Sequence, residues 1–280
     1  MNSILNVIHW NIEPEIFNIG TFGLRYYTLC FLLAFVSSYV LMLHIFKREQ
    51  KSQELLDQLS IYIFVGTLLG ARLGHCLFYE FDYYRHHPLE MILPYAYING
   101  QFTLTGFRGL ASHGGALGIL TGVFLFCRKT KTGFLWMADR LVIVVALAGA
   151  FVRVGNFFNS EIIGLPTHLP WAVVFQQVDQ VPRHPAQLYE AICYVLIFIL
   201  LWNVYHRKAS LKAGFLFGLF LITVFGARFI LEFLKENQEA FEEGMQYNMG
   251  QLLSIPFIAA GIYLLLRSDH EVKTAQEKLK

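Results

Sequence analysis

The chain has 280 residues, of which 55% are hydrophobic, 16% aromatic and only 15% charged. This composition is too apolar for a protein whose whole surface faces water, so a soluble domain is excluded and a membrane is the expected solvent. The formal net charge of +2 gives no reason to expect nucleic acid as a partner.

The first twenty residues contain no Lys or Arg, but they do contain Glu13 and Glu15. A cleavable signal peptide begins with a basic segment, so we expect the N-terminus to be retained.

Seven apolar windows follow, each close to the roughly 20 residues that a helix needs to cross a bilayer. Because backbone polar groups in lipid must be satisfied within their own segment, these windows predict helices. The predicted fold is all-α, a polytopic integral membrane protein whose residues 1–280 form a single transmembrane domain. The windows are residues 24–46, 58–80, 109–128, 138–157, 187–206, 213–234 and 247–266.

Basic residues are distributed unequally between alternate connections, and cytoplasmic loops normally carry the excess. One set has thirteen of the 22 Lys and Arg residues, whereas the other has only Arg85, Arg183 and Lys235. The count predicts an N-terminus outside and a C-terminus in the cytoplasm. The long connections 81–108 and 158–186 then lie on the outer face, where their Pro, Tyr and Trp residues suit arms at headgroup level.

The four cysteines are single residues within apolar stretches, without CxxC spacing or a neighbouring His pair. We therefore expect Cys30, Cys76, Cys127 and Cys193 to be packing residues, and we expect no metal site.

Six arginines lie within or at the ends of apolar windows: Arg25, Arg72, Arg108, Arg140, Arg153 and Arg228. An Arg at the bilayer centre costs about 2.5 kcal/mol or more, so such a residue should face a wet cavity or an anion. Arg25 and Arg140 suit interfacial anchors. Residue counting places Arg72, Arg153 and Arg228 in the outer half of their helices.

Other polar residues converge on the same layer, namely Tyr27, Ser112, His113 and Asn156. Asn156 shares a helix face with Arg153, and Glu232 follows Arg228 at the spacing where side chains meet. Asn159 and Glu161 lie just beyond. If the three arginines share one cavity with the two glutamates, one positive charge remains for a monoanion such as a phosphodiester headgroup, which the planar Arg fork suits.

Simpler interpretations remain open for each of these features. Arg228 and Glu232 could form only a structural ion pair, Arg72 could extend outward along its aliphatic stem, and His113 could be an ordinary interfacial histidine. The spacing of Gly66, Gly70, Gly74, Gly114, Gly118, Gly214 and Gly218 is typical of close helix packing. The segment from His184 to Glu190 suits a helix start, because Pro185 favours a first turn.

The stretch from Arg153 to Gly164, RVGNFFNSEIIG, closely resembles the signature of bacterial prolipoprotein diacylglyceryl transferases. Residues 70–74 with 78–79, 112–115, 183–190 and 228–233 resemble further segments of that family in the same order. The family also has seven helices and an outside N-terminus. Val152, Thr28 and Arg108 depart from its usual pattern.

The resemblance implies an enzyme of the bacterial cytoplasmic (inner) membrane with its active site toward the outer leaflet. It would transfer the diacylglyceryl group of phosphatidylglycerol to the lipobox cysteine of a prolipoprotein signal peptide, with no cofactor. A thiol with a pKa of about 8.5 needs help to become a thiolate, and a departing phosphate needs its charge stabilised. The implied catalytic residues are His113, Arg228 and Tyr27; the implied substrate-binding residues are Arg153, Asn156, Asn159, Glu161, Gly164, Arg72, Glu232, His184, Gln187 and Tyr189.

Three other functions are weighed against this one. A transporter or lipid flippase should carry polar residues through both leaflets, whereas the inner halves of these helices have almost no charge. A scaffold needs no arginine cluster. A hydrolase acting on phosphatidylglycerol is separated from the transferase by the resemblance alone.

Overall fold

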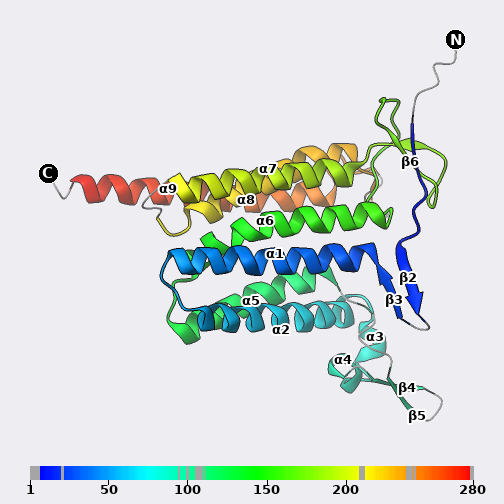
Figure 1. Cartoon of the computed structure of the whole chain (residues 1–280), viewed down its shortest axis with the longest axis horizontal. Coiled ribbons are helices and arrows are strands. Elements are labelled where there is room, and N and C mark those ends of the chain that lie inside the picture. Colours follow the sequence, from blue (N-terminus) through cyan, green and yellow to red (C-terminus); the bar gives the residue numbers. More distant parts are fainter. Residues whose placement is uncertain are drawn as a thin grey trace. The chain divides into compact units, whose positions relative to one another are not determined.

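The computed structural model describes residues 7–19, 22–93, 95–98, 101–104, 109, 111–207, 212–237, 242 and 244–277. Arg108 therefore lies outside the described residues. Long helices dominate the chain (Figure 1), and they are α1 Tyr26–Arg48, α2 Gln53–Phe78, α5 Ser112–Thr130, α6 Phe134–Phe158, α7 Ala186–Arg207, α8 Phe215–Leu231 and α9 Met249–Glu277.

In the described part of the chain, six helices are long and apolar enough to cross a membrane. They lie in α1, α2, α6, α7, α9 and the segment Phe215–Leu234. The chain is thus a mostly helical polytopic membrane protein, as predicted. The seventh predicted span forms α5, which is not among the six; its glycines, His113 and the Arg128-Lys129 pair make it less apolar. The count of seven stays a prediction, as does the orientation of the termini.

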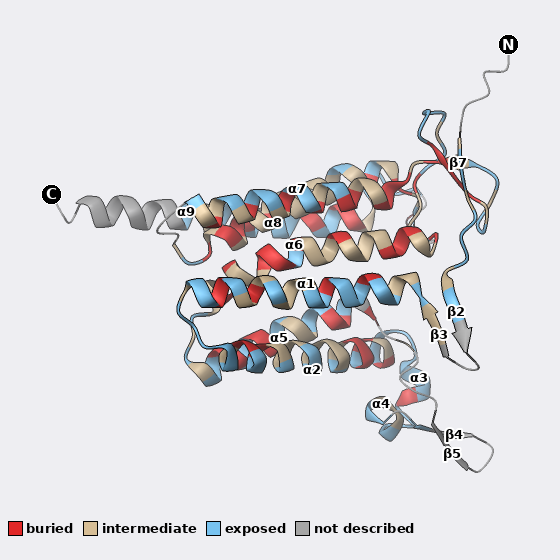
Figure 2. Ribbon diagram, in the orientation of Figure 1, coloured by how far each residue is buried: buried red, intermediate tan, exposed pale blue. Residues whose placement is uncertain are grey.

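Large apolar side chains are exposed along these helices, among them Leu32, Phe64 and Ile192. Exposed positions, coloured pale blue, recur along the length of the helices in Figure 2. Apolar surface of this kind is unfavourable in water but suits contact with lipid tails. Of the four cysteines, Cys30, Cys76 and Cys127 are buried and Cys193 is half-buried, which agrees with their predicted packing role.

The chain divides into two compact units, and each is described by itself. The first unit contains residues 1–42 and 138–280, and the second contains residues 43–137. That the two units form a single transmembrane domain stays a prediction. In the first unit α7, α8 and α9 run side by side (Figure 1), with α8 in contact with both of its neighbours.

Short strands occur in the connections, so the all-α prediction holds for the spans but not for the segments between them. In the first unit β1 Ile8–Trp10 pairs in parallel with β6 Val173–Phe175, which pairs antiparallel with β7 Pro182–Arg183. A second ladder joins β2 Glu15–Ile19 to β3 Phe22–Arg25. Phe157 of α6 forms a buried core with Val173 and Phe175 of β6, and Trp10 packs against it.

The second unit is built on close contact between α2 and α5. A Cβ atom added at Gly74 would lie 2.7 Å from Gly114 Cα, and one at Gly70 would lie 2.7 Å from Gly118 Cα. Only glycine permits backbones to approach so closely, which confirms the packing predicted from the glycine spacing. Beyond α2 the chain forms the short helices α3 Phe81–Tyr84 and α4 Leu89–Ile92 and the hairpin β4 Tyr95–Ile98 with β5 Gln101–Leu104.

Candidate active site

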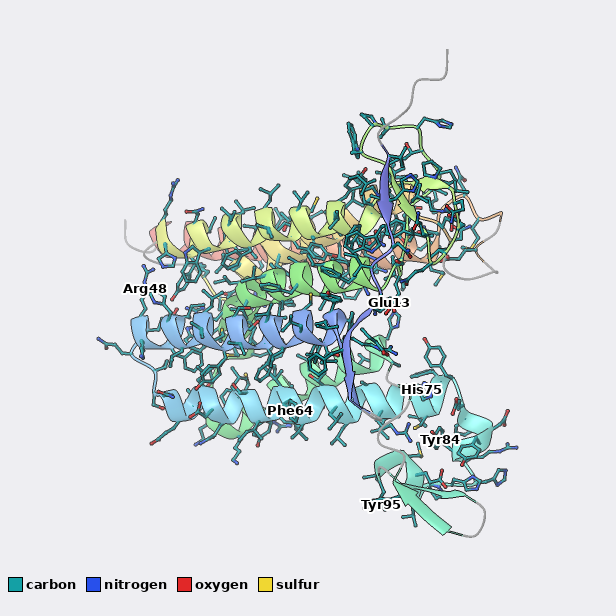
Figure 3. The ribbon with its side chains drawn as sticks, turned by 45° about the vertical axis from the view of Figure 1, so that its right-hand side comes forward. Glu13, Arg48, Phe64, His75, Tyr84 and Tyr95 are labelled. Carbon is teal, nitrogen blue, oxygen red and sulfur yellow. The ribbon has the colours of Figure 1, made fainter. Side chains whose placement is uncertain are left out.

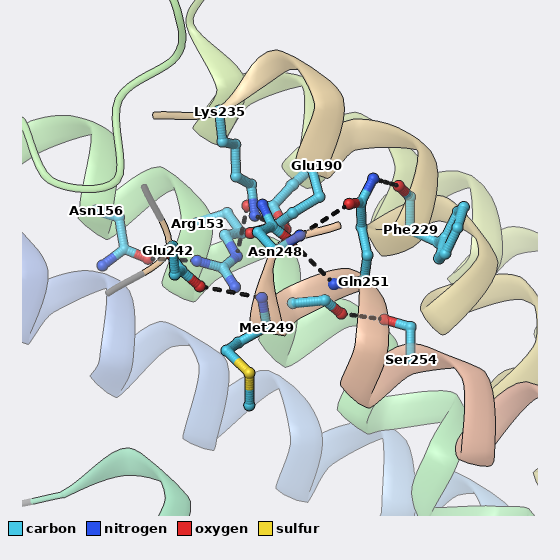
Figure 4. A network of polar contacts seen from close by, with 12 residues as sticks. Arg153, Asn156, Glu190, Phe229, Lys235, Glu242, Asn248, Met249, Gln251 and Ser254 are labelled. Atoms are coloured by element: carbon cyan, nitrogen blue, oxygen red, sulfur yellow. Dashed lines mark hydrogen bonds and ion pairs between the residues drawn. The ribbon is translucent and has the colours of Figure 1, made fainter. Parts of the chain in front are cut away.

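Polar residues of the first unit gather at the end where α1, α7 and α9 begin and where α6 and α8 finish. Four of them form a buried chain of ion pairs, and Figure 4 shows three of the four by name. Arg153 Nε lies 3.0 Å from Glu190 Oε2, and the other oxygen of Glu190 lies 2.9 Å from Lys235 Nζ. Lys235 Nζ also lies 2.9 Å from Glu232 Oε2.

Three of these four charges are almost completely removed from solvent, and the side chain of the fourth, Arg153, is 17% exposed. The side chains of Glu190, Lys235 and Glu232 are 0%, 2% and 6% exposed. Isolated buried charges are very costly, so each needs a partner of opposite sign. Two cations and two carboxylates supply this balance, and the four residues together have no net charge. We call Arg153, Glu190, Lys235 and Glu232 the ion-pair chain.

Two members of the ion-pair chain were missed as site residues in the sequence. Lys235 was counted with the outer loop, yet it is buried. Glu190 was recognised only as the end of a motif. A signal for Glu190 did exist, because a carboxylate one turn into an apolar window requires a partner. The identity of that partner, 45 positions along the chain, is a tertiary property.

The predicted pairing of Arg228 with Glu232 is wrong. The α-helix α8 ends at Leu231, and Glu232 begins the 3-10 helix η1 Glu232–Leu234. The Glu232 N–H still donates to the Arg228 carbonyl oxygen, so the backbone keeps the α-helical i, i+4 relation as far as Glu232, and only the Glu232 side chain turns elsewhere. Its carboxylate instead pairs with Lys235, three residues along.

Arg228 is left with donor capacity for another group. Its side chain is half-buried, and its Nε is buried without a hydrogen-bond partner among the described residues. Tyr194 is close enough to both Arg228 and Arg153 to interact electrostatically with each. Because an unsatisfied buried donor is costly, this guanidinium is suited to receive an anion.

The residues that follow Arg153 hold Glu161 in place. Arg153 Nη1 donates to Asn156 Oδ1 at 3.3 Å, and Asn156 Nδ2 donates to Glu161 Oε2 at 3.0 Å. Asn159 Nδ2 donates to the other oxygen of Glu161 at 3.1 Å. The predicted neighbourhood of these four residues is confirmed, and it presents the Glu161 carboxylate with two amide donors.

Asn159 and Glu161 also line a cavity of about 360 Å³. Its other lining residues are Glu13, Pro14, Glu15 and Arg25, and Arg25 pairs with Glu15 at 3.2 Å. The cavity is therefore polar and combines anionic, cationic and amide groups. Arg25, expected to be an interfacial anchor, forms part of its wall.

Gln187, Gly164 and His184 support this region mainly through the backbone. Gln187 Nε2 donates to the Glu161 carbonyl oxygen at 2.6 Å. Gly164 donates its N–H to the His184 carbonyl oxygen at 3.1 Å, and an added Cβ would lie 2.5 Å from His184 Cβ. The His184 ring nitrogen Nδ1 lies 3.2 Å from the hydroxyl of Tyr189. Gly164 is thus a packing position, and its N–H is not available to a headgroup.

An arginine fixes the connection that follows this region. The guanidinium of Arg183 contacts Asp179, the Gly164 carbonyl oxygen and Glu236. Hydrogen bonds from Arg183 lower the pKa of the Asp179 carboxyl below its ordinary value. Arg183 therefore links three stretches of the connections between helices.

Tyr27 lies against α6 in the same unit. A Cβ atom at Gly155 would approach Tyr27 Cδ2 to 2.9 Å, so this glycine allows the ring to pack closely. Glu161 and Arg153 are both near enough to act electrostatically on the Tyr27 hydroxyl. The structure thus brings Tyr27 beside the signature residues, as predicted.

The start of α9 completes this end of the first unit. Asn248 and Gln251 exchange hydrogen bonds between side chain and backbone in a reciprocal cap at 3.0 and 3.1 Å (Figure 4). A Cβ at Gly250 would lie 2.6 Å from the Glu232 carboxyl carbon. The sequence reasoning missed this contribution, although Asn followed three residues later by Gln is a helix-start signal.

Arg72 and His113 belong to the second unit. Arg72 is buried, and its Nη2 donates to the Glu90 carbonyl oxygen at 2.6 Å and to the Tyr84 hydroxyl at 3.1 Å. It therefore holds the segment after α2, where Figure 3 shows Tyr84 and Tyr95 beyond His75. His113 is exposed in the first turn of α5. The charge sum that combined Arg72 with Arg153 and Arg228 omitted Glu190 and Lys235, and the shared cavity stays a prediction.

The described residues contain no group of three or more His, Cys, Asp and Glu side chains placed to hold a metal ion. The expectation of a metal-free and cofactor-free reaction stays a prediction.

A polytopic helical membrane protein with arginines and carboxylates buried at one end of its helices is the class that this geometry defines. The family model described as prolipoprotein diacylglyceryl transferase matches residues 14–267, so the chain belongs to that family. It is therefore a transferase of lipoprotein modification.

Named relatives agree with this assignment over nearly their full length. Proteins called phosphatidylglycerol–prolipoprotein diacylglyceryl transferase are 45% identical over 95% of this chain and 96% of the relative in Bacteroides fragilis. The corresponding values are 46%, 95% and 99% in Tolumonas auensis. In Chloroherpeton thalassium they are 42%, 96% and 96%.

Proposed function

We propose that this chain transfers the diacylglyceryl group of phosphatidylglycerol to the lipobox cysteine of a prolipoprotein, the first step of lipoprotein maturation. Family membership supports the reaction class, and the names of the relatives supply the two substrates. The observation that carries the proposal at the level of the site is Arg228, whose buried Nε has no partner among the described residues.

Arg228 receives the lipid phosphate in this proposal. The ion-pair chain is already neutral, so an arriving phosphodiester finds in Arg228 a cation that has no ion-pair partner among the described residues. Arg153 contributes the edge of its guanidinium that faces Asn156. Arg is suited to this role because its planar fork donates two parallel hydrogen bonds to phosphate oxygens.

The glycerol headgroup fits the polar cavity beside Glu161. A carboxylate held by Asn156 and Asn159 is a fixed acceptor for hydroxyl groups. Glu232 acts within the ion-pair chain and not through Arg228. Gln187, His184, Tyr189 and Gly164 keep the Glu161 segment in position, and Arg72 orders the outer segment of the second unit.

The reaction is a substitution at the carbon of the diacylglyceryl unit that is joined to the phosphate oxygen. The cysteine sulfur forms a bond to this carbon, the carbon–oxygen bond breaks, and its electron pair leaves with glycerol phosphate. His113 takes the thiol proton as general base, and Tyr27 hydrogen-bonds the leaving group or shares the base role. Arg228 and Arg153 stabilise the negative charge that grows on the phosphate.

We further propose seven spans, with α5 as the seventh, an outside N-terminus and a cytoplasmic C-terminus in the bacterial inner membrane. The loop charge count supports this orientation, which directs the site to the outer leaflet. The connections 81–108 and 158–186 are then outer arms at headgroup level.

The test is an assay of the purified protein with phosphatidylglycerol and a peptide containing the acceptor cysteine. Thioether product and glycerol phosphate should appear in equal amounts, and neither should form when the cysteine is replaced by serine. Glycerol phosphate without the peptide adduct would indicate a hydrolase instead. Neither product from folded protein would contradict both enzymatic functions.

A further inference from the structure

We infer that Lys235 is a positioning residue for the lipid-binding Arg153, acting through Glu190. This inference rests on the proposed function, because it assigns a residue that shapes the phosphate site. Lys235 is the centre of the ion-pair chain: its ammonium is 2.9 Å from Glu190 Oε1 and 2.9 Å from Glu232 Oε2.

The backbone fixes Lys235 in place independently of its side chain. Lys235 forms an antiparallel bridge with Gly164, the last residue of the signature stretch. On either side of it Leu165 N–H donates to the Leu234 carbonyl at 2.8 Å, and Glu236 N–H donates to the Ile163 carbonyl at 3.2 Å. The ammonium is therefore directed at Glu190 by a short piece of paired backbone and not by a flexible loop.

Glu190 divides its two oxygens between two cations. Oε1 contacts Lys235, and Oε2 contacts Nε of Arg153. Arg153 consequently meets this carboxylate through one oxygen, while its Nη1 points to Asn156 Oδ1 at 3.3 Å. With Lys235 occupying Oε1, Glu190 cannot draw Arg153 into a two-oxygen pair.

Loss of the ammonium changes this division. Without Lys235, both oxygens of a fully buried Glu190 would be available to Arg153, and the bidentate pair is the strongest geometry that these groups can form. The guanidinium would then turn away from Asn156 and from the lipid phosphate. Glu232 would also lose its ion-pair partner inside the protein, which destabilises the fold.

A Lys235→Met variant tests the inference through the two Michaelis constants. We expect KM for phosphatidylglycerol to rise roughly tenfold or more, with KM for the peptide unchanged, because lost phosphate binding affects the lipid substrate alone. Lys235→Arg, which keeps a cation between the two carboxylates, should recover most of the lipid affinity. Lys47→Met removes the same charge at an exposed position of α1 and should leave both constants as in the wild type.

A second pair of variants tests the inference even if Lys235→Met folds poorly. Lys235→Met with Glu232→Gln leaves Arg153 and Glu190 as a balanced pair, and Glu232→Gln alone is its reference. The double variant should bind phosphatidylglycerol roughly tenfold more weakly than its reference, measured by direct lipid binding in detergent. Equal lipid binding by the two, or an unchanged lipid KM in Lys235→Met, would overturn the inference. Absence of thioether from the wild type would instead refute the proposed function, and the binding comparison would still decide the role of Lys235.

Discussion

The two units of the molecule differ in how they supply partners for their arginines. In the second unit Arg72 donates to backbone carbonyls a short distance along the chain, and α2 meets α5 through glycine backbones. In the first unit Arg153 depends on Glu190, which depends on Lys235, and these residues come from three separate elements. The contacts in the second unit follow from the spacing of residues along the chain. The ion pairs of the first unit form only when its helices have assembled.

The largest effect is expected from substitution of Arg228, the cation that the first unit leaves available for an anion. Arg228→Gln should lower kcat/KM by roughly 10²–10³, since a donor aimed at developing phosphate charge is lost. The kcat/KM of Arg228→Lys should lie between those of the wild type and Arg228→Gln, because a point charge replaces a planar donor of two parallel hydrogen bonds. Steady-state kinetics of thioether formation would measure both, and wild-type rates in Arg228→Gln would remove Arg228 from the site.

The packing of the second unit is tested by the same substitution at two glycines. Gly70→Ala forces a Cβ to 2.7 Å from Gly118 Cα and should lower the free energy of unfolding by about 1–3 kcal/mol. Gly115→Ala meets nothing nearer than 3.6 Å and should be neutral or slightly stabilising. Thermal unfolding in detergent gives the comparison, and equal melting temperatures would contradict the close-contact interpretation.

A third substitution acts on the ion-pair chain from outside. Gly250→Ala places a Cβ 2.6 Å from the Glu232 carboxyl carbon, so the carboxylate that pairs with Lys235 must shift. We expect a loss of about 1 kcal/mol in stability and a severalfold fall in activity. Gly226→Ala in α8, where a Cβ meets nothing within 4 Å, is the matched control. A normal activity for Gly250→Ala would show that Glu232 tolerates displacement.

The smallest expected effect concerns the connection between α6 and α7. Asp179 has a lowered pKa because Arg183 donates to it, so its contribution to stability is present above the pKa of the unfolded chain. That contribution is lost as the pH falls through the lower pKa of the folded protein. Asp179→Asn should therefore cost about 1 kcal/mol or less at pH 7 and nothing at strongly acidic pH. A cost that grows on acidification would reverse the assigned sign.

Sequence patterns predicted the helices well, because lipid permits few alternatives to a helix. The window 24–46 became Tyr26–Arg48, and 187–206 became Ala186–Arg207. The neighbourhood of Arg153, Asn156 and Glu161 was also predictable, since all three lie within nine positions of one another.

Ion-pair partners in the first unit were not predictable from the sequence. Lys235 looks like a loop residue, and its burial depends on Glu190 from α7 and on a backbone bridge to Gly164. Glu232 keeps the α-helical backbone hydrogen bond to the Arg228 carbonyl oxygen, yet its carboxylate pairs with Lys235. Helix spacing therefore brings two residues within reach of each other but does not decide between competing charged partners.

The central claim is that Arg228 is the cation available to a lipid phosphate. Native mass spectrometry of the protein with phosphatidylglycerol tests it without requiring turnover, using Gly226→Ala as the control. The account predicts that the wild type and the control retain the bound lipid, and that Arg228→Gln, folded to the same melting temperature, loses it. Equal retention by Arg228→Gln would contradict the claim.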